Sequence, residues 1–180
     1  MKQEPREMLG FYENFPVNIH RIETFSTTFS NKKLQQKLIR VLSEINRRTF
    51  SFEEITCPTV PECRVIFEAG LAEAKSFNYI DEEETKKVLG ALRKAPFQTM
   101  DFFCAVRYYK GTAENKKPLK FDYYMMRAVF GKNAVEIQVF HERGPRYISP
   151  EDIVNFLVNE VNKTSSRRIL KKVEVEPEPF

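Results

Sequence analysis

Tryptophan is absent from this chain of 180 residues, and glycine, cysteine and histidine are scarce, at 6, 3 and 2 residues. So few glycines leave little capacity for the tight loops that cradle phosphates, which excludes a glycine-rich nucleotide-binding loop. The cysteines are odd in number and lack the two-residue spacing of zinc knuckles and thioredoxin-like redox sites, which excludes a disulfide scaffold. We therefore expect neither a bound metal ion nor a cofactor.

Long apolar runs are also lacking. No stretch approaches the ~18 consecutive apolar residues that a membrane-spanning helix needs. The first residues of the chain carry both charge signs and lead into an apolar segment too short for a signal peptide. Together with the sparse cysteines, this predicts a cytoplasmic protein with no membrane partner.

The residues that are present have the composition of an ordinary globular protein. Hydrophobic residues make up 42% and charged residues 30% of the chain, and 16 Phe and 7 Tyr side chains are available to fill a core. A chain of this length buries roughly 70% of its unfolded surface, so it needs no disulfide or metal for stability. We predict a single α+β domain over residues 1–170 and a disordered tail over residues 171–180, where Glu and Pro alternate.

The first half of the chain contains one predicted strand and three predicted helices. Apolar residues at odd-numbered positions between residues 17 and 29 predict the strand. After Ser30, apolar residues recur at spacings of three and four as far as Ile45, which predicts an amphipathic helix. An alanine-rich run over residues 62–76 predicts a second helix. Asp81 with Glu84 has the spacing of a capping box and begins the third.

In the second half of the chain, the apolar residues recur at every second position. Alternation over residues 100–109, 121–130 and 135–139 predicts three consecutive strands, the last two joined by a short hairpin. Ser149, followed by Pro150 and two acidic residues, has the pattern of a helix N-terminus. The order of strand, three helices, three-stranded meander and C-terminal helix predicts an α+β fold. We expect a largely antiparallel sheet of about four strands with the helices packed on one face.

The net charge of +4 conceals a strong segregation of charge along the chain. Residues 31–48 carry six basic and one acidic side chain. Residues 49–85 carry two basic and nine acidic side chains, and residues 86–132 carry eleven basic and three acidic ones. If the basic segments converge, they form a positive surface that binds phosphates; otherwise they are solvated faces of amphipathic helices. The residues predicted to contact nucleic acid are Lys32, Lys33, Lys37, Arg40, Arg47, Arg48, Lys116, Lys117, Lys120, Arg167 and Arg168.

Aromatic side chains of the predicted meander offer a second way to bind nucleic acid. Tyr109 and Tyr123 fall on the mixed face of the predicted sheet, together with Arg107 or Arg127. Such side chains stack on bases if no other layer covers them. Aromatic stripes are more often part of a core. The choice depends on strand order and on what covers this face.

The densest polar cluster in the sequence is His141 to Tyr147, at the end of the last predicted strand. Alternation places His141 and Arg143 on one face, where with Arg127 or Asp101 they can hold a carboxylate or phosphate, and His141 is the candidate general acid or base. The plainer interpretation is a strand end with surface ion pairs. Two histidines supply few groups that titrate near neutral pH, which lowers the expectation of an enzyme.

These features favour a non-enzymatic binding or regulatory module whose partner is anionic, a nucleic acid or an acidic protein, bound through the basic segments. The first alternative is a small-molecule enzyme or ligand-binding domain with its site on the mixed sheet face near His141, Arg107, Arg127 and Arg143, which requires a pocket between sheet and helices. The second is a structural subunit that forms homo-oligomers through an open sheet edge or an exposed aromatic face.

Overall fold

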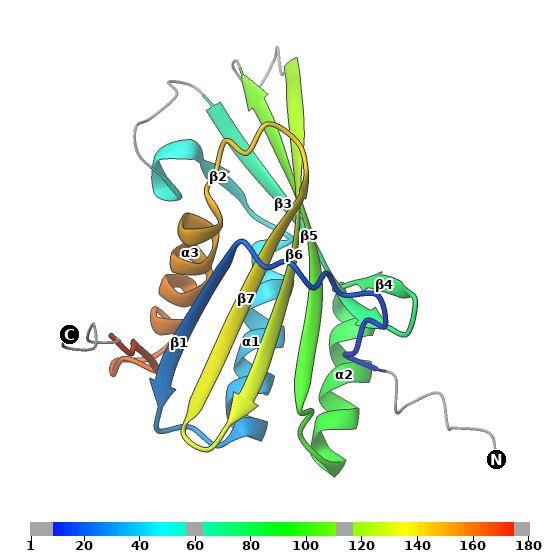
Figure 1. Ribbon diagram of the computed structural model, residues 1–180, viewed down its shortest axis with the longest axis vertical. Helices are drawn as coiled ribbons and strands as arrows, with labels where there is room; N and C mark the ends of the chain where they lie inside the picture. Colours follow the sequence, from blue (N-terminus) through cyan, green and yellow to red (C-terminus); the bar gives the residue numbers. More distant parts are fainter. Residues whose placement is uncertain (1–8, 57–62, 111–116, 175–180) are drawn as a thin grey trace.

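Figure 1 shows a computed structural model of the protein, which describes residues 9–56, 63–110 and 117–174. The strands of these residues are β1 (Arg21–Thr27), β2 (Thr49–Ser51), β3 (Cys63–Glu73), β4 (Ser76–Tyr79), β5 (Thr99–Lys110), β6 (Lys117–Gly131), β7 (Ala134–Arg143) and β8 (Leu170–Lys172). The helices are α1 (Asn31–Ile45), α2 (Glu82–Lys94) and α3 (Pro150–Asn162), and a short 3-10 helix, η2 (Phe52–Glu54), follows β2.

The eight strands of the described chain form one antiparallel sheet in the order β2-β3-β5-β6-β7-β1-β8, with β4 paired to β3. Helices α1 and α3 lie against one face of this sheet, and α2 packs against α1 (Figure 1). We call the face that α1 and α3 cover the inner face, and the opposite one the outer face. The predicted α+β fold with a largely antiparallel sheet is confirmed, but the described sheet has eight strands where about four were predicted.

The inner face follows from the two-residue alternation of the central strands. In β5 the even-numbered residues from Met100 to Tyr108 are buried, and in β6 Tyr124, Met126 and Ala128 are buried in the same core. The helices contribute the other half of this core, chiefly through Leu38, Leu42, Ile153, Phe156 and Leu157. Each fully buried side chain of this size is worth roughly 1.5–3 kcal/mol, so the meander requires helices on this side.

The prediction of a second helix over residues 62–76 is wrong, because this segment contains the strand β3 and the start of β4. Its odd-numbered residues from Cys63 to Leu71 are buried, which is the period of a strand. Pairing with β5 outweighs the helix preference of alanine, worth under about 1 kcal/mol per residue. At Gly70 a Cβ would lie 3.1 Å from the Asn78 carbonyl oxygen of β4, so small residues here permit strand pairing.

The starts predicted for the other three helices are confirmed. Ser30, Asp81 and Ser149 cap α1, α2 and α3, and each side chain accepts a hydrogen bond from the backbone N–H three residues later. The meander of β5, β6 and β7 is also present, as predicted. Lys171 and Lys172, which the sequence pattern assigns to a tail, belong to β8, and residues 175–180 lie outside the described residues.

The chain before β1 completes the sheet where β3 and β5 separate. These two strands pair only from Cys63 to Ala69, and beyond that point Gly10 lies between them. Its N–H donates to the Ala72 carbonyl oxygen and its own carbonyl oxygen accepts from the Asp101 N–H, each at 2.7 Å. Gly10 has a φ of +89°, in the region that favours glycine.

Arg127 of β6 anchors this N-terminal segment to the outer face. Its Nε and Nη2 atoms donate to the two carboxylate oxygens of Asp101, at 2.7 and 2.8 Å, and Asp101 is fully buried. The Tyr12 N–H donates to the same carboxylate at 2.8 Å. The Arg127 guanidinium also lies over the rings of Phe11 and Phe15, 5.2 and 4.3 Å from their centroids. The lower part of the outer face is therefore covered by this segment.

The variant Arg127→Met removes the cation and leaves the Asp101 carboxylate buried without its partner. We expect the free energy of unfolding, measured by urea denaturation, to fall by about 3–5 kcal/mol. Arg143→Met, which alters an exposed arginine on β7, is the matched control and should change it by less than about 0.5 kcal/mol. Equal losses in the two variants would contradict the anchoring role of Arg127.

Candidate functional site

The structure divides the basic residues predicted to bind nucleic acid among separate regions. Helix α1, which follows β1, begins at the lower end of the sheet in Figure 1 and carries Lys32, Lys33, Lys37 and Arg40. Lys120 lies near the start of β6, at the upper end. The start of α1 and this part of β6 are therefore at opposite ends of the sheet. Lys116 and the side chain of Lys117 lie outside the described part of the chain.

Several of these cations are engaged within the fold. Arg47 forms an ion pair with Glu82 at 3.2 Å, and Arg48 forms one with Glu160 of α3 at the same distance. The Lys32 ammonium donates to a backbone carbonyl oxygen near the end of α2, at 2.9 Å. These contacts join the helices to one another, so they leave less positive charge on the α1 side than the sequence indicates.

The remaining predicted cations are scattered, and all but the half-buried Lys37 are exposed. Lys37 and Arg40 make no ion pair within the described residues, and they lie on the side of the sheet that the helices cover. Arg167 and Arg168 are exposed between α3 and β8. The predicted nucleic-acid residues thus do not gather into one patch in the described part of the structure.

The structure does not bring His141, Arg143 and Arg127 together. A β-bulge interrupts the pairing of β6 and β7, so that Tyr124 lies opposite His141 and Tyr123 lies opposite Arg143. Residues directly opposed in paired strands share a face. His141 is therefore on the inner face with buried Tyr124, and Arg143 is on the outer face. The prediction that both share a face is wrong because the bulge shifts the alternation by one residue.

His141 instead belongs to a buried polar cluster around Asp122 of β6. The Asp122 carboxylate is fully buried and accepts four hydrogen bonds. Its donors are His141 Nε2 at 2.8 Å, the Tyr108 hydroxyl at 2.6 Å, the Arg146 N–H at 2.6 Å and the Tyr147 N–H at 2.9 Å. A carboxylate only accepts, so His141 Nε2 carries its proton here. Asp122 thus anchors the loop that leads into α3.

The alternation of apolar residues in β6 contains a signal for this cluster. Asp122 lies in phase with Tyr124, Met126 and Ala128, which are all buried, and an acidic residue on such a face needs several donors. Gly144 supports the same loop with a φ of +112°, and a Cβ there would collide with the carbonyl oxygen of Phe121.

The titration of the surrounding groups favours a fixed network. Burial raises the pKa of Tyr108 and that of Tyr124, so both hydroxyls remain donors, Tyr124 to the Ile148 carbonyl oxygen. Burial, with Arg146 nearby, lowers the pKa of His20, whose Nδ1 accepts a hydrogen bond from the His141 N–H at 2.9 Å. The cluster therefore positions backbone rather than presenting a free acid or base.

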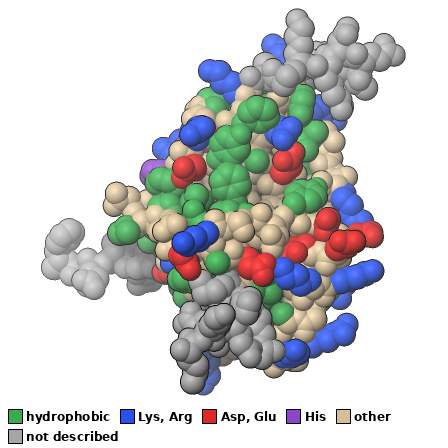
Figure 2. Space-filling view, turned by 90° about the vertical axis from the view of Figure 1, so that its right-hand side faces the viewer, with side chains coloured by type: hydrophobic (Ala, Val, Ile, Leu, Met, Phe, Trp, Pro, Cys, Tyr) green, Lys and Arg blue, Asp and Glu red, His purple; other side chains and the backbone are tan. Residues whose placement is uncertain are grey.

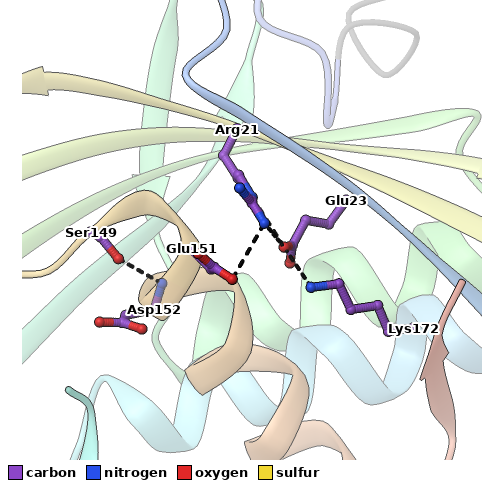
Figure 3. A network of polar contacts seen from close by, with 6 residues as sticks. All are labelled: Arg21, Glu23, Ser149, Glu151, Asp152 and Lys172. Carbon is purple, nitrogen blue, oxygen red and sulfur yellow. Dashed lines mark hydrogen bonds and ion pairs between the residues drawn. The ribbon is translucent and has the colours of Figure 1, made fainter. Parts of the chain in front are cut away.

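A second buried carboxylate, Glu23 of β1, joins the sheet edge to α3 and β8 (Figure 3). Its Oε1 atom accepts hydrogen bonds from Arg21 at 2.9 Å and from Lys172 at 3.0 Å, whereas Oε2 has no partner among the described residues. Arg21 also reaches Glu151, in the first turn of α3, at 3.3 Å. Two acidic and two basic groups compensate each other here, so this network offers no net charge to a ligand.

The interior between the sheet and the helices α1 and α3 leaves little room for a small molecule. The cavity between α1, α3 and the sheet measures about 20 Å³ and is lined by apolar side chains such as Ile45, Phe67 and Phe156. Small-molecule sites have volumes of roughly 300–1,000 Å³. This cavity cannot be the substrate pocket that the enzyme alternative requires.

The upper part of the outer face carries aromatic side chains that none of the helices in the described residues covers. Phe103 of β5 and Tyr123 and Phe121 of β6 form a row, with ring centroids 5.5 Å apart for the first pair and 6.3 Å apart for the second. These three residues, which we call the aromatic row, lie outside the hydrophobic core, and Phe121 is 38% exposed. Figure 2 shows hydrophobic side chains gathered in the upper part of this side of the molecule, with charged groups around them.

Basic side chains surround the aromatic row. Arg107 lies over the Phe121 ring, 5.2 Å from its centroid. Its Nε atom is 2.9 Å from Glu68 Oε1 at an angle too poor for a hydrogen bond, and its Nη2 donates to Oε2 at 3.3 Å.

Two further cations flank this arrangement. Arg64 lies opposite Tyr109 in the pairing of β3 with β5, and Arg143 lies opposite Tyr123. Both are exposed and form no ion pair within the described chain, and we call them the basic rim. Lys120 precedes Phe121 in β6, so alternation places it on the opposite face, and neither residue of the basic rim belongs to the predicted nucleic-acid set.

The described residues contain no group of three or more His, Cys, Asp or Glu side chains that could hold a metal ion. Cys63 and Cys104 are buried free thiols, and burial raises the pKa of Cys104 to about 12. Cys57 lies outside the part that the structure describes. None of the helices in that part is both long and apolar enough to cross a membrane.

Comparison with protein-family models, with curated proteins and with solved structures found no significant match.

The role of Asp122 is tested by the variant Asp122→Asn, which keeps the size of the side chain but removes its charge and places an N–H₂ group against donors. We expect the free energy of unfolding to fall by about 3 kcal/mol, measured by urea denaturation. Amide hydrogen exchange of residues 144–148 should accelerate in parallel. The matched control is Glu142→Gln, at an exposed position in the same region, with an expected change below about 0.5 kcal/mol. An unchanged exchange rate in that loop would rule out the anchoring role.

Proposed function

We propose that this protein is a non-enzymatic binding module for nucleic acid, and that the nucleic acid lies on the upper outer face of the sheet, across the aromatic row and the basic rim. One observation carries the proposal. Two exposed cations without an acidic partner in the described chain, Arg64 and Arg143, flank the aromatic row, in which Phe121 is exposed. Phosphates are attracted by such cations, and aromatic faces accept any base.

The outer face supports this function better than α1 does. Among the α1-side cations, Arg47 and Arg48 are already paired with acidic residues, and Lys32 is bound to a backbone carbonyl oxygen. An engaged cation loses part of its attraction for phosphate because the partner's charge must first be displaced. The cations of the basic rim carry no such cost within the described residues.

An enzymatic function receives less support. His141, the candidate general acid or base, uses its Nε2 atom to bind the saturated Asp122 carboxylate. Arg127 is committed to Asp101 and to the rings of the N-terminal segment. Two of the residues proposed for catalysis, His141 and Arg127, therefore serve stability and lie on different faces of the sheet.

Association through sheet edges also receives less support. The terminal strands of the described sheet, β2 and β8, have three residues each, and the last residues of β8 are lysines. Short, charged edges are poor templates for pairing with another chain. A protein partner on the aromatic row remains as the other occupant, and the experiment below separates it from nucleic acid.

The test is fluorescence anisotropy of labelled RNA and DNA oligonucleotides titrated with the protein at low and near-physiological salt. We expect binding that weakens steeply with salt. The double variant Arg64→Gln/Arg143→Gln should reduce the slope of log affinity against log salt by about 1.4, since each phosphate contact on a single strand contributes about 0.7.

The matched control is Lys37→Gln/Arg40→Gln, which removes the same charge from α1. It should leave both affinity and salt slope close to those of the unmodified protein. Absence of binding at low salt would refute the proposed function. Equal weakening by both double variants would show that only net charge matters and would refute the outer face as the site.

A further inference from the structure

We infer, on the basis of the proposed function, that the nucleic acid is single-stranded and that its bases stack on Phe121 and Tyr123 of the aromatic row. The proposed function alone requires only phosphate contacts, which a duplex supplies equally well. The arrangement of the rings on the outer face adds a second requirement, for bases whose faces are accessible.

The aromatic row continues a longer ladder of rings that is closed at one end and open at the other. At the closed end, Tyr12 of the N-terminal segment packs on Phe77 of β4, with centroids 4.7 Å apart, and Phe77 packs on Phe103 at 5.4 Å. The ladder then passes to Tyr123 and ends at Phe121, the most exposed of its members on β5 and β6. A further flat group can therefore add to the ladder at its open end.

The open end has a fixed orientation. The Arg107 guanidinium lies over the Phe121 ring and is held in place by its ion pair with Glu68. Tyr123 and Phe103 stack with an interplanar angle of 27°, which keeps the Tyr123 ring from turning freely. Rings that are already held in position lose little conformational entropy when a base stacks on them.

A duplex does not satisfy this arrangement. The faces of paired bases are covered by their neighbours in the stack, and only their edges and the phosphates are accessible to a protein. A single strand presents base faces, and stacking on aromatic side chains is tolerant of sequence because every base has a flat face. The basic rim lies on both sides of the row, at Arg64 on β3 and Arg143 on β7, where it can follow the backbone of a strand that crosses the sheet.

The experiment compares four labelled probes by anisotropy at one salt concentration: single-stranded RNA, single-stranded DNA, a DNA duplex, and an abasic strand that keeps the sugar and phosphate groups but lacks bases. We expect the unmodified protein to bind the single strands about tenfold or more tightly than the abasic strand and the duplex. Phe121→Leu should weaken single-strand binding by about tenfold and leave abasic binding unchanged.

The matched control is Phe11→Leu. Phe11 is 39% exposed, against 38% for Phe121, and each ring lies 5.2 Å from an arginine guanidinium, but Phe11 belongs to the N-terminal segment and lies outside the aromatic row. It should leave single-strand affinity unchanged. At the second position, Tyr123→Phe keeps the ring and should retain binding, whereas Tyr123→Leu should lose it, which separates stacking from a general loss of folding.

The possible failures are distinguishable. Equal affinity for single strand, duplex and abasic strand, unaffected by Phe121→Leu, would overturn base stacking while leaving phosphate binding on this face intact. Binding to none of the four probes would overturn the proposed function together with this inference. Selective binding to RNA or to DNA single strands supports the inference in either case, because stacking does not depend on the sugar.

Discussion

The covering of only one face of a wide sheet is the constraint on which the rest of this structure depends. Two helices, α1 and α3, bury the inner face of the eight-stranded sheet, and the chain has no further helix for the outer face within the described residues. The N-terminal segment covers the lower part of that face and is held there by Arg127 and Asp101. The upper part, with Phe121 at its centre, stays accessible to solvent.

Three buried carboxylates fix the segments that are not part of the central meander. Asp101 holds the N-terminal segment, Asp122 holds the loop before α3, and Glu23 holds β8 and the first turn of α3. Burying an unpaired carboxylate costs several kcal/mol, so each is stable only when its donors arrive together. Charge in this protein therefore serves two separate purposes, because the paired groups secure the fold while the cations of the basic rim remain available to a partner.

The local elements were accessible from the sequence because their signals act over a few residues. Ser30 and Ser149 cap their helices, and alternation from Met100 to Tyr108 marks β5. The alanine-rich segment at residues 62–76 was mistaken for a helix, since its strand character depends on pairing with β5, which is distant in the sequence. For the candidate site, Arg107 and Tyr123 could be named from the sequence, whereas Arg64 and Phe121 could not be assigned to it.

The sequence by itself determined the α+β class, the starts of α1, α2 and α3, the meander and the segregation of charge, because capping, periodicity and composition are properties of contiguous residues. Only the tertiary structure decided that α1 and the start of β6 lie at opposite ends of the sheet, and that a bulge separates His141 from Arg143. It also decided which face stays uncovered. These features depend on strand order and register, which arise from pairing between segments far apart in the chain, and no local pattern specifies them.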